Sequence, residues 1–394
     1  MASNQKIAFV ANTSWSIYKF RLYLIEKLTE KGFTIFVLAP RDPYTARFES
    51  LPGLTYIELQ HFKGKSISPL QDILLYRELL HHYRTIRPDL IFHYTIKANL
   101  FGTRAAARAG IPSVSVITGL GYAFAGNGWL QSVARFLYKK ELRNSTEVWF
   151  LNEDDRHIFT TRQLIRPEKT FLLPGEGVDT QTFYPAPYAA QNSATPQGSA
   201  APGAAKKEIT FLLIGRIIRH KGIYEFVQAT QRLKQQGLAI RCQLLGFFDD
   251  KNPVAIPRHE IEEWSGTGLL TYLGHTDNVA PFIEQADCIV LPSWREGLPL
   301  SLLEGASMCK ALIATDTPGC RDLIDEGVNG YLCREKDAAD LAEKMAVYYH
   351  LPAGDKIKMG LAGREKVLSA FTREKVAAIY LEKINLFRLT SNEY

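Results

Sequence analysis

The sequence has few cysteines and no long apolar segment. Its 394 residues include five cysteines, no two of which form a C-x-x-C pair. This spacing argues against a zinc knuckle or a closed disulfide framework, and it favours a reducing compartment. No stretch of about 18 apolar residues occurs, so we expect no membrane-spanning helix. The polar start leads into the short apolar run 7–11 without the apolar core of a signal peptide, so we expect a cytoplasmic protein.

The charge is nearly balanced but unevenly placed. Residues 1–185 carry 23 Lys and Arg against 16 Asp and Glu, whereas the remaining residues carry 24 against 25. The net excess of +6 therefore comes from the first half. This half either presents a solvated basic surface or faces an anionic partner such as acidic lipid or a diphosphate. No nucleic-acid-binding motif accompanies the charge, so we expect no nucleic-acid partner.

Hydrophobic residues make up 46% of the chain, enough for a globular core. Short β-rich runs alternate with segments of helical period, which is typical of α/β domains with parallel sheets. The runs are Ile7–Ala11, Thr34–Ala39, Leu90–His93, Ser113–Ile117 and Val148–Leu151, then Ile209–Ile214, Ile240–Leu245, Leu269–Leu273, Cys288–Leu291 and Ala311–Ala314.

This alternation predicts two Rossmann-like domains, at 1–185 and 207–370. A tract rich in Ala, Pro, Ser, Gly and Gln at 186–206 is predicted to be a linker because it has no apolar face to bury. A C-terminal helix over 371–394 could pack back on the N-terminal domain. Ligands of open parallel sheets bind beyond the carboxyl ends of the strands, so we expect the site in a cleft that the two sheets face.

One strand exit in the second half combines glycine with two cations. The run Ile209–Ile214 leads into the loop Gly215–Gly222, and a helix begins near residue 223. Arg216 offers a planar donor fork and Lys221 a compact charge, which together could neutralise a diphosphate at the helix start. The spacing departs from a Walker loop and disfavours a P-loop NTPase. A solvated basic loop is the alternative interpretation.

A second motif follows the apolar run 288–291. Glu296 lies in the strand-exit loop and Glu304 about two turns into the next helix. Glu304 could accept hydrogen bonds from two ribose hydroxyls, and Glu296 could accept them from a sugar. The amides near residues 300 and 301 could receive an anion. The alternative is that these glutamates only cap the helix or interact with its dipole.

At these residues the chain resembles a known family. The ordered set G-R-x-x-x-x-K-G at 215–222, D-x-x-x-x-P-S at 287–293 and E-G-x-P-x-x-x-x-E at 296–304 is similar to the retaining glycosyltransferases of family four, which have the glycosyltransferase-B architecture. The N-terminal half resembles a narrower subset that adds sugars to polyprenyl-diphosphate-linked saccharides. That likeness lies in Y-x-F-R at 18–21, Y-T-I-K-A-N-x-F-G at 94–102 and T-G-L-G at 118–121.

The resemblance implies transfer of a hexose or N-acetylhexosamine from a UDP-sugar to a lipid-linked saccharide or related glycan acceptor. Arg216 and Lys221 would bind the donor diphosphate, and Glu296 would bind the transferred sugar. In front-face attack the departing diphosphate accepts the acceptor's proton, so we expect no metal and no other cofactor. The donor-binding candidates are Gly215, Arg216, Lys221, Glu296, Gly297, Leu298, Pro299, Leu300, Ser301 and Glu304, with Glu296, Arg216 and Lys221 as catalytic candidates.

The N-terminal half departs from the family at two places. Thr118 stands where many relatives carry His, and residues 12–16 replace a Gly-Gly pair. His93, near a strand end, is either a replacement for the missing histidine or a structural residue. The acceptor-side candidates are Asn12, Arg21, His93, Lys97, Asn99, Thr118 and Gly119.

The segment Trp129–Arg143 mixes aromatic and basic residues at helical spacing. It is either an ordinary domain helix or a basic amphipathic helix at a membrane interface. Together with the basic first half and the resemblance, it favours peripheral association with the anionic inner face of the plasma membrane. The membrane-face candidates are Trp129, Arg135, Lys139, Lys140 and Arg143.

Two other functions share the same architecture. A nucleotide-sugar 2-epimerase would convert the donor without an acceptor, and a non-catalytic module would only bind it. The E-G-x-P motif and the lack of an evident carboxylate and histidine constellation for epimerisation favour the transferase.

Overall fold

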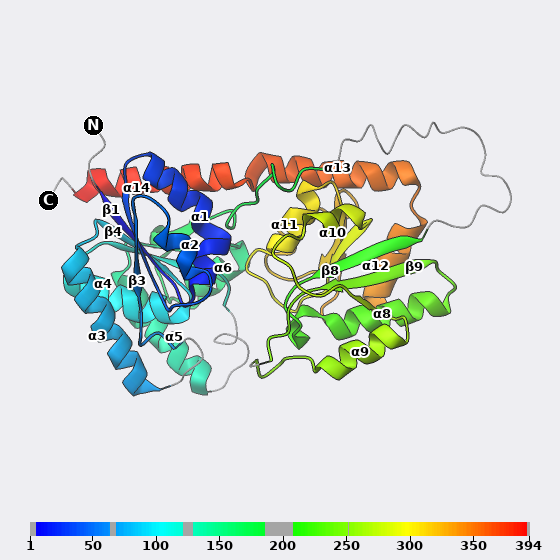
Figure 1. Ribbon diagram of the computed structural model, residues 1–394, viewed down its shortest axis with the longest axis horizontal. Coiled ribbons are helices and arrows are strands. Elements are labelled where there is room, and N and C mark those ends of the chain that lie inside the picture. The colour runs from blue at the N-terminus through cyan, green and yellow to red at the C-terminus, as the bar shows by residue number, and fades with distance from the viewer. Residues whose placement is uncertain (1–4, 64–67, 121–128, 186–207, 251, 392–394) are drawn as a thin grey trace. The chain divides into compact units, whose positions relative to one another are not determined.

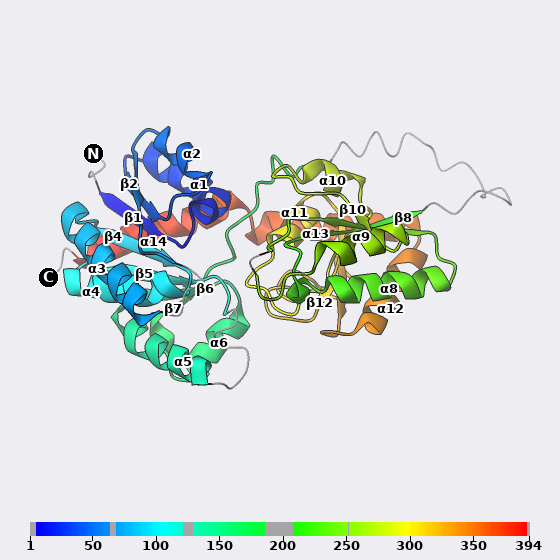
Figure 2. The same ribbon diagram turned by 60° about the horizontal axis from the view of Figure 1, so that its bottom comes forward.

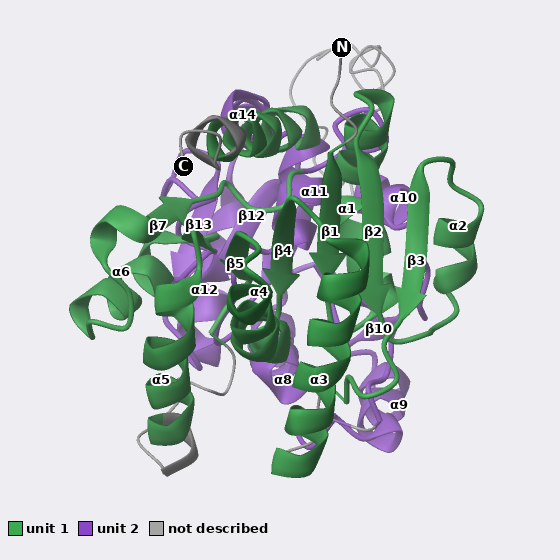
Figure 3. Ribbon diagram, turned by 90° about the vertical axis from the view of Figure 1, so that its left-hand side faces the viewer, with its two compact units in different colours: residues 1–177, 373–394 green, residues 178–372 purple. Residues whose placement is uncertain are grey.

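The computed structural model describes residues 5–63, 68–120, 129–185, 208–250 and 252–391, without the side chains of 129–131 and 388–391 (Figure 1). The chain forms two compact units, one of Met1–Gly177 with Arg373–Tyr394 and one of Val178–Thr372 (Figure 3). Each unit contains one parallel β-sheet with helices, which confirms the predicted fold class of two Rossmann-like α/β domains. No helix of the described ranges has the length and apolar character needed to cross a membrane.

The first unit contains a seven-stranded sheet in the order β3-β2-β1-β4-β5-β6-β7. The strands are β1 Lys6–Val10, β2 Thr34–Ala39, β3 Leu54–Glu58, β4 Leu90–Tyr94, β5 Ser113–Ile117, β6 Glu147–Phe150 and β7 Thr170–Leu172. The helices are α1 Ser14–Glu30, α2 Thr45–Glu49, α3 Pro69–Ile86, η1 Ala98–Gly102, α4 Thr103–Ala109, α5 Trp129–Glu141, η3 Leu142–Asn144, α6 Glu153–Thr161, η4 Pro167–Lys169 and α14 Arg373–Ser391.

The second unit contains a six-stranded sheet in the order β10-β9-β8-β11-β12-β13. The strands are β8 Ile209–Ile214, β9 Ile240–Leu245, β10 Thr271–Tyr272, β11 Cys288–Leu291, β12 Ala311–Thr315 and β13 Gly330–Cys333. The helices are η5 Arg219–Lys221, α8 Ile223–Gln235, α9 Arg258–Gly266, α10 Ala280–Gln285, α11 Leu300–Ser307, α12 Ala338–His350 and α13 Ala353–Ala370.

Helices cover both faces of the second sheet (Figure 1). Phe211 and Leu213 of β8 point into a core with α8 and α12, whereas Leu212 of the same strand points into a core with α10, α11 and α13. Successive strand side chains alternate between faces, so a strand buried on both sides must be apolar throughout. The continuous apolar run in β8 therefore follows from its central place in the sheet.

The chain enters the second unit earlier than the boundary predicted at residue 185. Val178 is buried in the core of the second unit, where its N–H donates to the Phe371 carbonyl (2.9 Å). The Ser307 hydroxyl donates to the Phe183 carbonyl (2.6 Å). Residues 178–185 therefore pack on the second unit. The predicted linker at 186–206 lies outside the described residues.

The C-terminal helix α14 belongs to the first unit, the location considered for it in the sequence. The Tyr380 ring lies 4.8 Å from the Trp149 ring and 5.1 Å from the Phe92 ring, measured between centroids. Lys383 Nζ pairs with Glu147 Oε1 at 2.7 Å. The last helix therefore completes the aromatic core against β4 and β6.

A buried chain of polar side chains connects α3, β4, α4 and β5. His93 Nε2 lies 2.9 Å from the Tyr83 hydroxyl, and His93 Nδ1 lies 3.3 Å from the Thr103 hydroxyl. The Thr103 hydroxyl lies 2.8 Å from the Ser115 hydroxyl, which in turn lies 2.8 Å from the Ser145 hydroxyl. His93 is fully buried. The acceptor-side interpretation of His93 is therefore corrected to the structural one, because both ring nitrogens are used inside the fold.

This burial makes His93 a source of acid sensitivity. Burial lowers the pKa of His93 from 6.5 to about 3, so the unfolded chain binds a proton there that the folded chain resists. The stabilising contribution is complete above pH 6.5 and is lost as the pH falls toward about 3. We predict that His93→Gln, which cannot titrate, shows a shallower fall of Tm over this range than the wild type. Equal falls in thermal melts of the two proteins would contradict this prediction.

Candidate active site

The two predicted motifs follow neighbouring strands of the second sheet. Strands β8 and β11 pair in parallel, with Phe211 opposite Cys288 and Leu212 opposite Ile289. Their carboxyl ends therefore meet at one edge of the sheet. The loop 215–222 leaves β8 there, and the loop 292–299 leaves β11 beside it. This is the edge at which parallel α/β sheets bind ligands.

Hydrogen bonds and one ion pair join the two loops. The His220 carbonyl accepts the Ser293 hydroxyl at 2.9 Å and the Trp294 N–H at 3.0 Å. Lys221 Nζ lies 2.5 Å from Glu296 Oε1, and the two side chains are only 18% and 13% exposed. The structure therefore brings together two of the three predicted catalytic residues, 75 positions apart in the sequence.

Glycine is required where the loops approach other backbone. Gly222 has a φ of +72°, and a Cβ there would lie 1.9 Å from the Pro292 carbonyl oxygen. Gly246, directly after β9, would place a Cβ 1.7 Å from the Gly215 carbonyl oxygen. Both distances are far below any van der Waals contact. Gly246 is not among the residues predicted for the site, although its place directly after a β-rich run was the available signal.

Arg216 is held less tightly than Lys221. Its side chain is 46% exposed, and its Nη1 lies 3.4 Å from Asp249 Oδ2, at the long end of an ion pair. Nearby, burial and then the charges of Lys336 and Arg219 lower the pKa of His220. The exposed Arg216 side chain is therefore able to turn toward an anionic ligand.

The remaining donor-side candidates lie at or near the start of α11. Pro299 is the extended residue before the helix, with φ −75° and ψ 115°. Leu298 and Leu300 pack partly on the core below. Glu304 lies about one turn after the first residue of α11 and is only 4% exposed. The backbone of Gly297 is covered closely by Gly319, whose Cβ would lie 2.2 Å from the Gly297 carbonyl oxygen. Ser301 is half-buried in the first turn.

Several acceptor-side candidates share the carboxyl edge of the first sheet. Asn12 follows β1, Lys97 and Asn99 follow β4, and Thr118 with Gly119 follows β5. Lys97 Nζ pairs with Asp72 Oδ1 at 2.7 Å. The buried Asn99 amide donates to the Val116 carbonyl at 3.0 Å. These residues follow strands that are adjacent in the order β1-β4-β5, so the topology brings them to one edge of the sheet.

Arg21 has a different place from the one predicted for it. Only 3% of its side chain is exposed, it forms an ion pair with Glu176, and it donates to the Ser16 carbonyl at 2.9 Å. Its guanidinium carbon lies 3.8 Å from the centre of the Tyr94 ring. Arg21 therefore ties α1 to β4 and to the end of the first unit, inside the fold.

No group of three or more His, Cys, Asp or Glu side chains with metal-ligand geometry occurs within the described ranges. Arg216 and Lys221 place two positive charges at the candidate site.

Two family models match the chain. The model of the "Glycosyl transferase 4-like domain" matches residues 19–175, and that of "Glycosyl transferases group 1" matches residues 208–350. The first match lies in the first unit and the second in the second unit.

Two curated relatives have names that state a reaction. The chain is 28% identical to N,N'-diacetylbacillosaminyl-diphospho-undecaprenol alpha-1,3-N-acetylgalactosaminyltransferase of Campylobacter jejuni, over 91% of this chain and 92% of the relative. It is 23% identical to UDP-Gal:alpha-D-GlcNAc-diphosphoundecaprenol alpha-1,3-galactosyltransferase of Escherichia coli, over 69% of each.

Solved structures share the fold. Sucrose-phosphate synthase from Thermosynechococcus elongatus superposes with a TM-score of 0.80 at 20% identity, covering 99% of this chain and 100% of the other. Anabaena HepE in complex with UDP and glucose gives a TM-score of 0.73 at 16% identity, covering 97% and 99%. At these identities the likeness shows the architecture.

Removing Arg21 should destabilise the first unit. We predict that Arg21→Ala costs about 3–5 kcal/mol of unfolding free energy, because Glu176 would be left buried without its cation. Lys97→Ala is the matched control, since its pair with Asp72 is more exposed and should cost about 1 kcal/mol or less. Urea denaturation of both variants tests this, and equal small losses would show that Arg21 does not hold the fold.

Proposed function

This chain belongs to the group 1 glycosyltransferases, and we propose that it moves a hexose or N-acetylhexosamine, with retention, from a UDP-sugar to a saccharide carried on a polyprenyl diphosphate. The observation that carries the donor assignment is the joined pair of loops after β8 and β11. The acceptor assignment draws on the curated relatives, whose names specify sugars linked to diphospho-undecaprenol. One of those names also specifies UDP-Gal as the donor.

In the proposed donor complex, Arg216 and Lys221 bind the diphosphate. The exposed Arg216 supplies a bidentate fork, and the partly buried Lys221 supplies a fixed charge. A carboxylate has two oxygens, so Glu296 can keep Lys221 in place and accept a hydrogen bond from a sugar hydroxyl. Glu304, on the next turn of α11, takes the ribose hydroxyls. The position of the two loops at one sheet edge supports these proposed roles.

The proposed reaction is a front-face substitution. The acceptor hydroxyl oxygen forms a bond to the anomeric carbon on the side from which the diphosphate oxygen departs, and the bond from that carbon to the diphosphate oxygen breaks. The proton of the acceptor hydroxyl passes to an oxygen of the departing UDP. Arg216 and Lys221 stabilise the negative charge that develops there. We propose that these two cations meet the need for charge without a resident metal.

We also propose that the protein acts in the cytoplasm at the inner face of the plasma membrane. All five cysteines, each of them described, are free thiols, which suits a reducing compartment. On α5, Val133 and Phe136 are 46% and 64% exposed, while Lys139 and Lys140 are also exposed. A helix with this outer face can contact an anionic bilayer. The Trp129 side chain lies outside the described residues, and Arg143 follows the helix in η3.

Release of UDP tests the proposed activity. With a panel of UDP-sugars and a short lipid-diphosphate-linked saccharide, UDP should appear in step with the glycosylated product and only when acceptor is present. Turnover should be the same with and without EDTA. Conversion of the donor to its epimer without acceptor would identify a 2-epimerase instead. Binding of UDP-sugar with neither product would identify a binding module.

Two arginines of one loop provide a matched pair for the donor site. We predict that Arg216→Ala lowers UDP affinity about ten- to a hundredfold, the effect of losing a charge-assisted contact of about 1.5–3 kcal/mol. Arg219→Ala removes the same charge from a side chain that lies over the Tyr224 ring, and it should bind UDP nearly as the wild type does. Isothermal titration measures both affinities. Equal affinities in the two variants would refute the diphosphate role of Arg216.

A further inference from the structure

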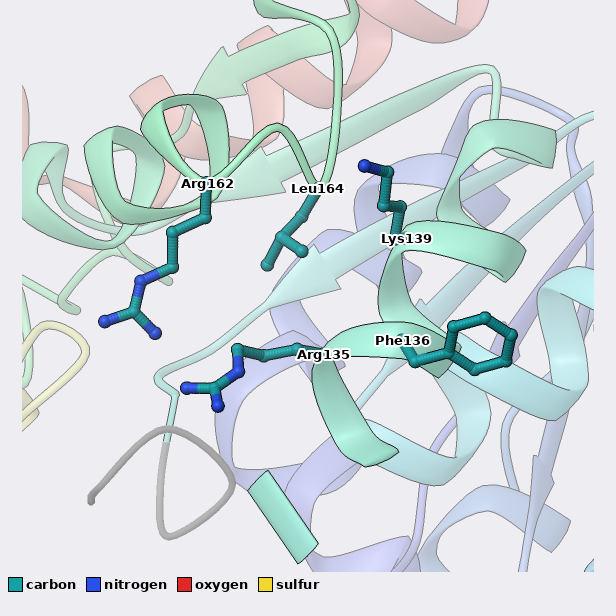
Figure 4. Close-up of a pocket in the computed structure, with 5 residues that line it drawn as sticks. All are labelled: Arg135, Phe136, Lys139, Arg162 and Leu164. Carbon is teal, nitrogen blue, oxygen red and sulfur yellow. The ribbon is translucent and has the colours of Figure 1, made fainter. Parts of the chain in front are cut away.

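An open pocket on the first unit is lined by three cations from two segments of the chain. Arg135, Phe136 and Lys139 come from α5, and Arg162 and Leu164 come from the turn after α6 (Figure 4). The pocket has a volume of about 500 Å³. Arg162 and Leu164 lie outside the segment that the sequence marked as a membrane face, so the pocket arises only from the tertiary fold.

Packing between the two helices fixes the pocket. Helices α5 and α6 lie side by side (Figure 2). The buried Tyr138 ring meets the buried Phe159 ring edge-on, with 5.4 Å between centroids. Leu164 is also buried in this core, at 6% exposure. The inner side of α5 is thus held against the unit, and Lys139, next to Tyr138, is left at the exposed surface.

The three cations of the pocket are not neutralised within the described part of the chain. Arg135 Nη2 donates to the Ser132 hydroxyl at 3.1 Å, and among the described residues no carboxylate forms an ion pair with Arg135, Lys139 or Arg162. In the same unit, by contrast, Lys97 and Lys383 each have a carboxylate partner within 2.7 Å. Three like charges around one hollow focus a positive potential and attract a multiply charged anion.

The pocket also has apolar surface. Leu164 lies between Arg162 and Lys139, and the two guanidinium groups extend toward the same side (Figure 4). Phe136 is 64% exposed, and Val133, one turn earlier on α5, is 46% exposed. Large exposed apolar side chains beside a basic hollow suit a ligand that carries an anionic group on an apolar tail.

We propose that this pocket binds the phosphate headgroup of a membrane phospholipid. The Arg135 and Arg162 forks and the Lys139 ammonium contact the phosphate oxygens, and Phe136 and Val133 rest against the acyl chains. This inference rests on the proposed membrane association and replaces a diffuse attraction by a defined site. It distinguishes Lys139, which lines the pocket, from its neighbour Lys140, which does not.

Two pairs of basic residues allow a test with matched changes of charge. Lys139→Gln and Arg162→Gln alter the pocket, whereas Lys140→Gln and Arg166→Gln remove the same charges from exposed positions outside its lining. The probe is a set of phosphatidylcholine vesicles that contain phosphatidic acid, and the measurement is co-sedimentation with full-length protein. We expect the pocket variants to lose about tenfold or more in the partition constant. The control variants should lose about fivefold or less, the share of one charge near an anionic surface.

Equal losses in pocket and control variants would overturn the site and leave only diffuse attraction. This comparison requires that the four charge variants keep the unfolding midpoint of the wild type. Phe136→Ser is a further change in the same pocket that removes no charge. It should weaken vesicle binding without altering the net charge. If Phe136→Ser and both pocket variants bind as the wild type does, the headgroup site is wrong.

Competition separates the possible sources of the phosphate. Inorganic phosphate and glycerol phosphate at the concentration of vesicle lipid should not release the protein, because they lack the apolar tail. Release by either one would show that a free phosphate is the ligand and would overturn the lipid site. Polyprenyl diphosphate that competes more strongly than phosphatidic acid would likewise replace the phospholipid by the acceptor carrier.

The vesicle-binding measurement tests the headgroup site independently of the transferase assay. If vesicle binding differs between the pocket and control variants but the wild type releases no UDP, the proposed function is overturned and the headgroup site is kept. Protein that releases UDP with acceptor, yet shows no difference between the matched variants, would keep the function and overturn the site.

Discussion

The ion pair between Lys221 and Glu296 is the interaction on which the candidate site depends. It joins the exits of two central strands at 2.5 Å, in surroundings where neither side chain is more than one-fifth exposed. Removing either partner would leave the other charge partly buried and uncompensated, which is costly. The Ser293 and Trp294 hydrogen bonds to the His220 carbonyl hold the same two loops. Charge and backbone are therefore in position before a donor arrives, which is the condition for electrostatic stabilisation of a leaving group.

The first unit uses charged and polar residues mainly to hold its own fold together. Arg21, Tyr94 and Glu176 form one buried cluster that joins α1, β4 and the last residues before the chain leaves the unit. The unit is completed only by α14, whose Tyr380 hydroxyl lies 3.0 Å from the Tyr94 hydroxyl. The C-terminal helix is thus part of the domain that the N-terminus begins. Of the acceptor-side candidates that follow β4 and β5, Asn99 is buried, whereas Lys97, Thr118 and Gly119 are partly exposed.

The fold and the function of this protein are inferred from different observations. The superposed structures share less than 25% identity with the chain and establish the architecture, which many unrelated activities share. The family matches establish a glycosyltransferase, and the proposed donor site rests on side chains that one sheet edge brings together. The basic pocket between α5 and the turn after α6 is a second proposed anion site, separate in the sequence from the motifs at 215–222 and 296–304. A phosphate group is the common target of both features, although one is proposed for a nucleotide and the other for a lipid.

The sequence by itself determined the alternation of strands and helices, the two domains and the ordered motifs at 215–222 and 296–304, because these depend on periodicity and on short spacings. It did not predict β3, β7 or β13, three edge strands that are only partly buried. Only the tertiary structure decided the roles of Arg21 and His93. Arg21 meets a partner 155 residues away, and the burial of His93 comes from packing that no local pattern encodes. The same reason applies to Arg162, whose place in the basic pocket exists only once α6 packs against α5.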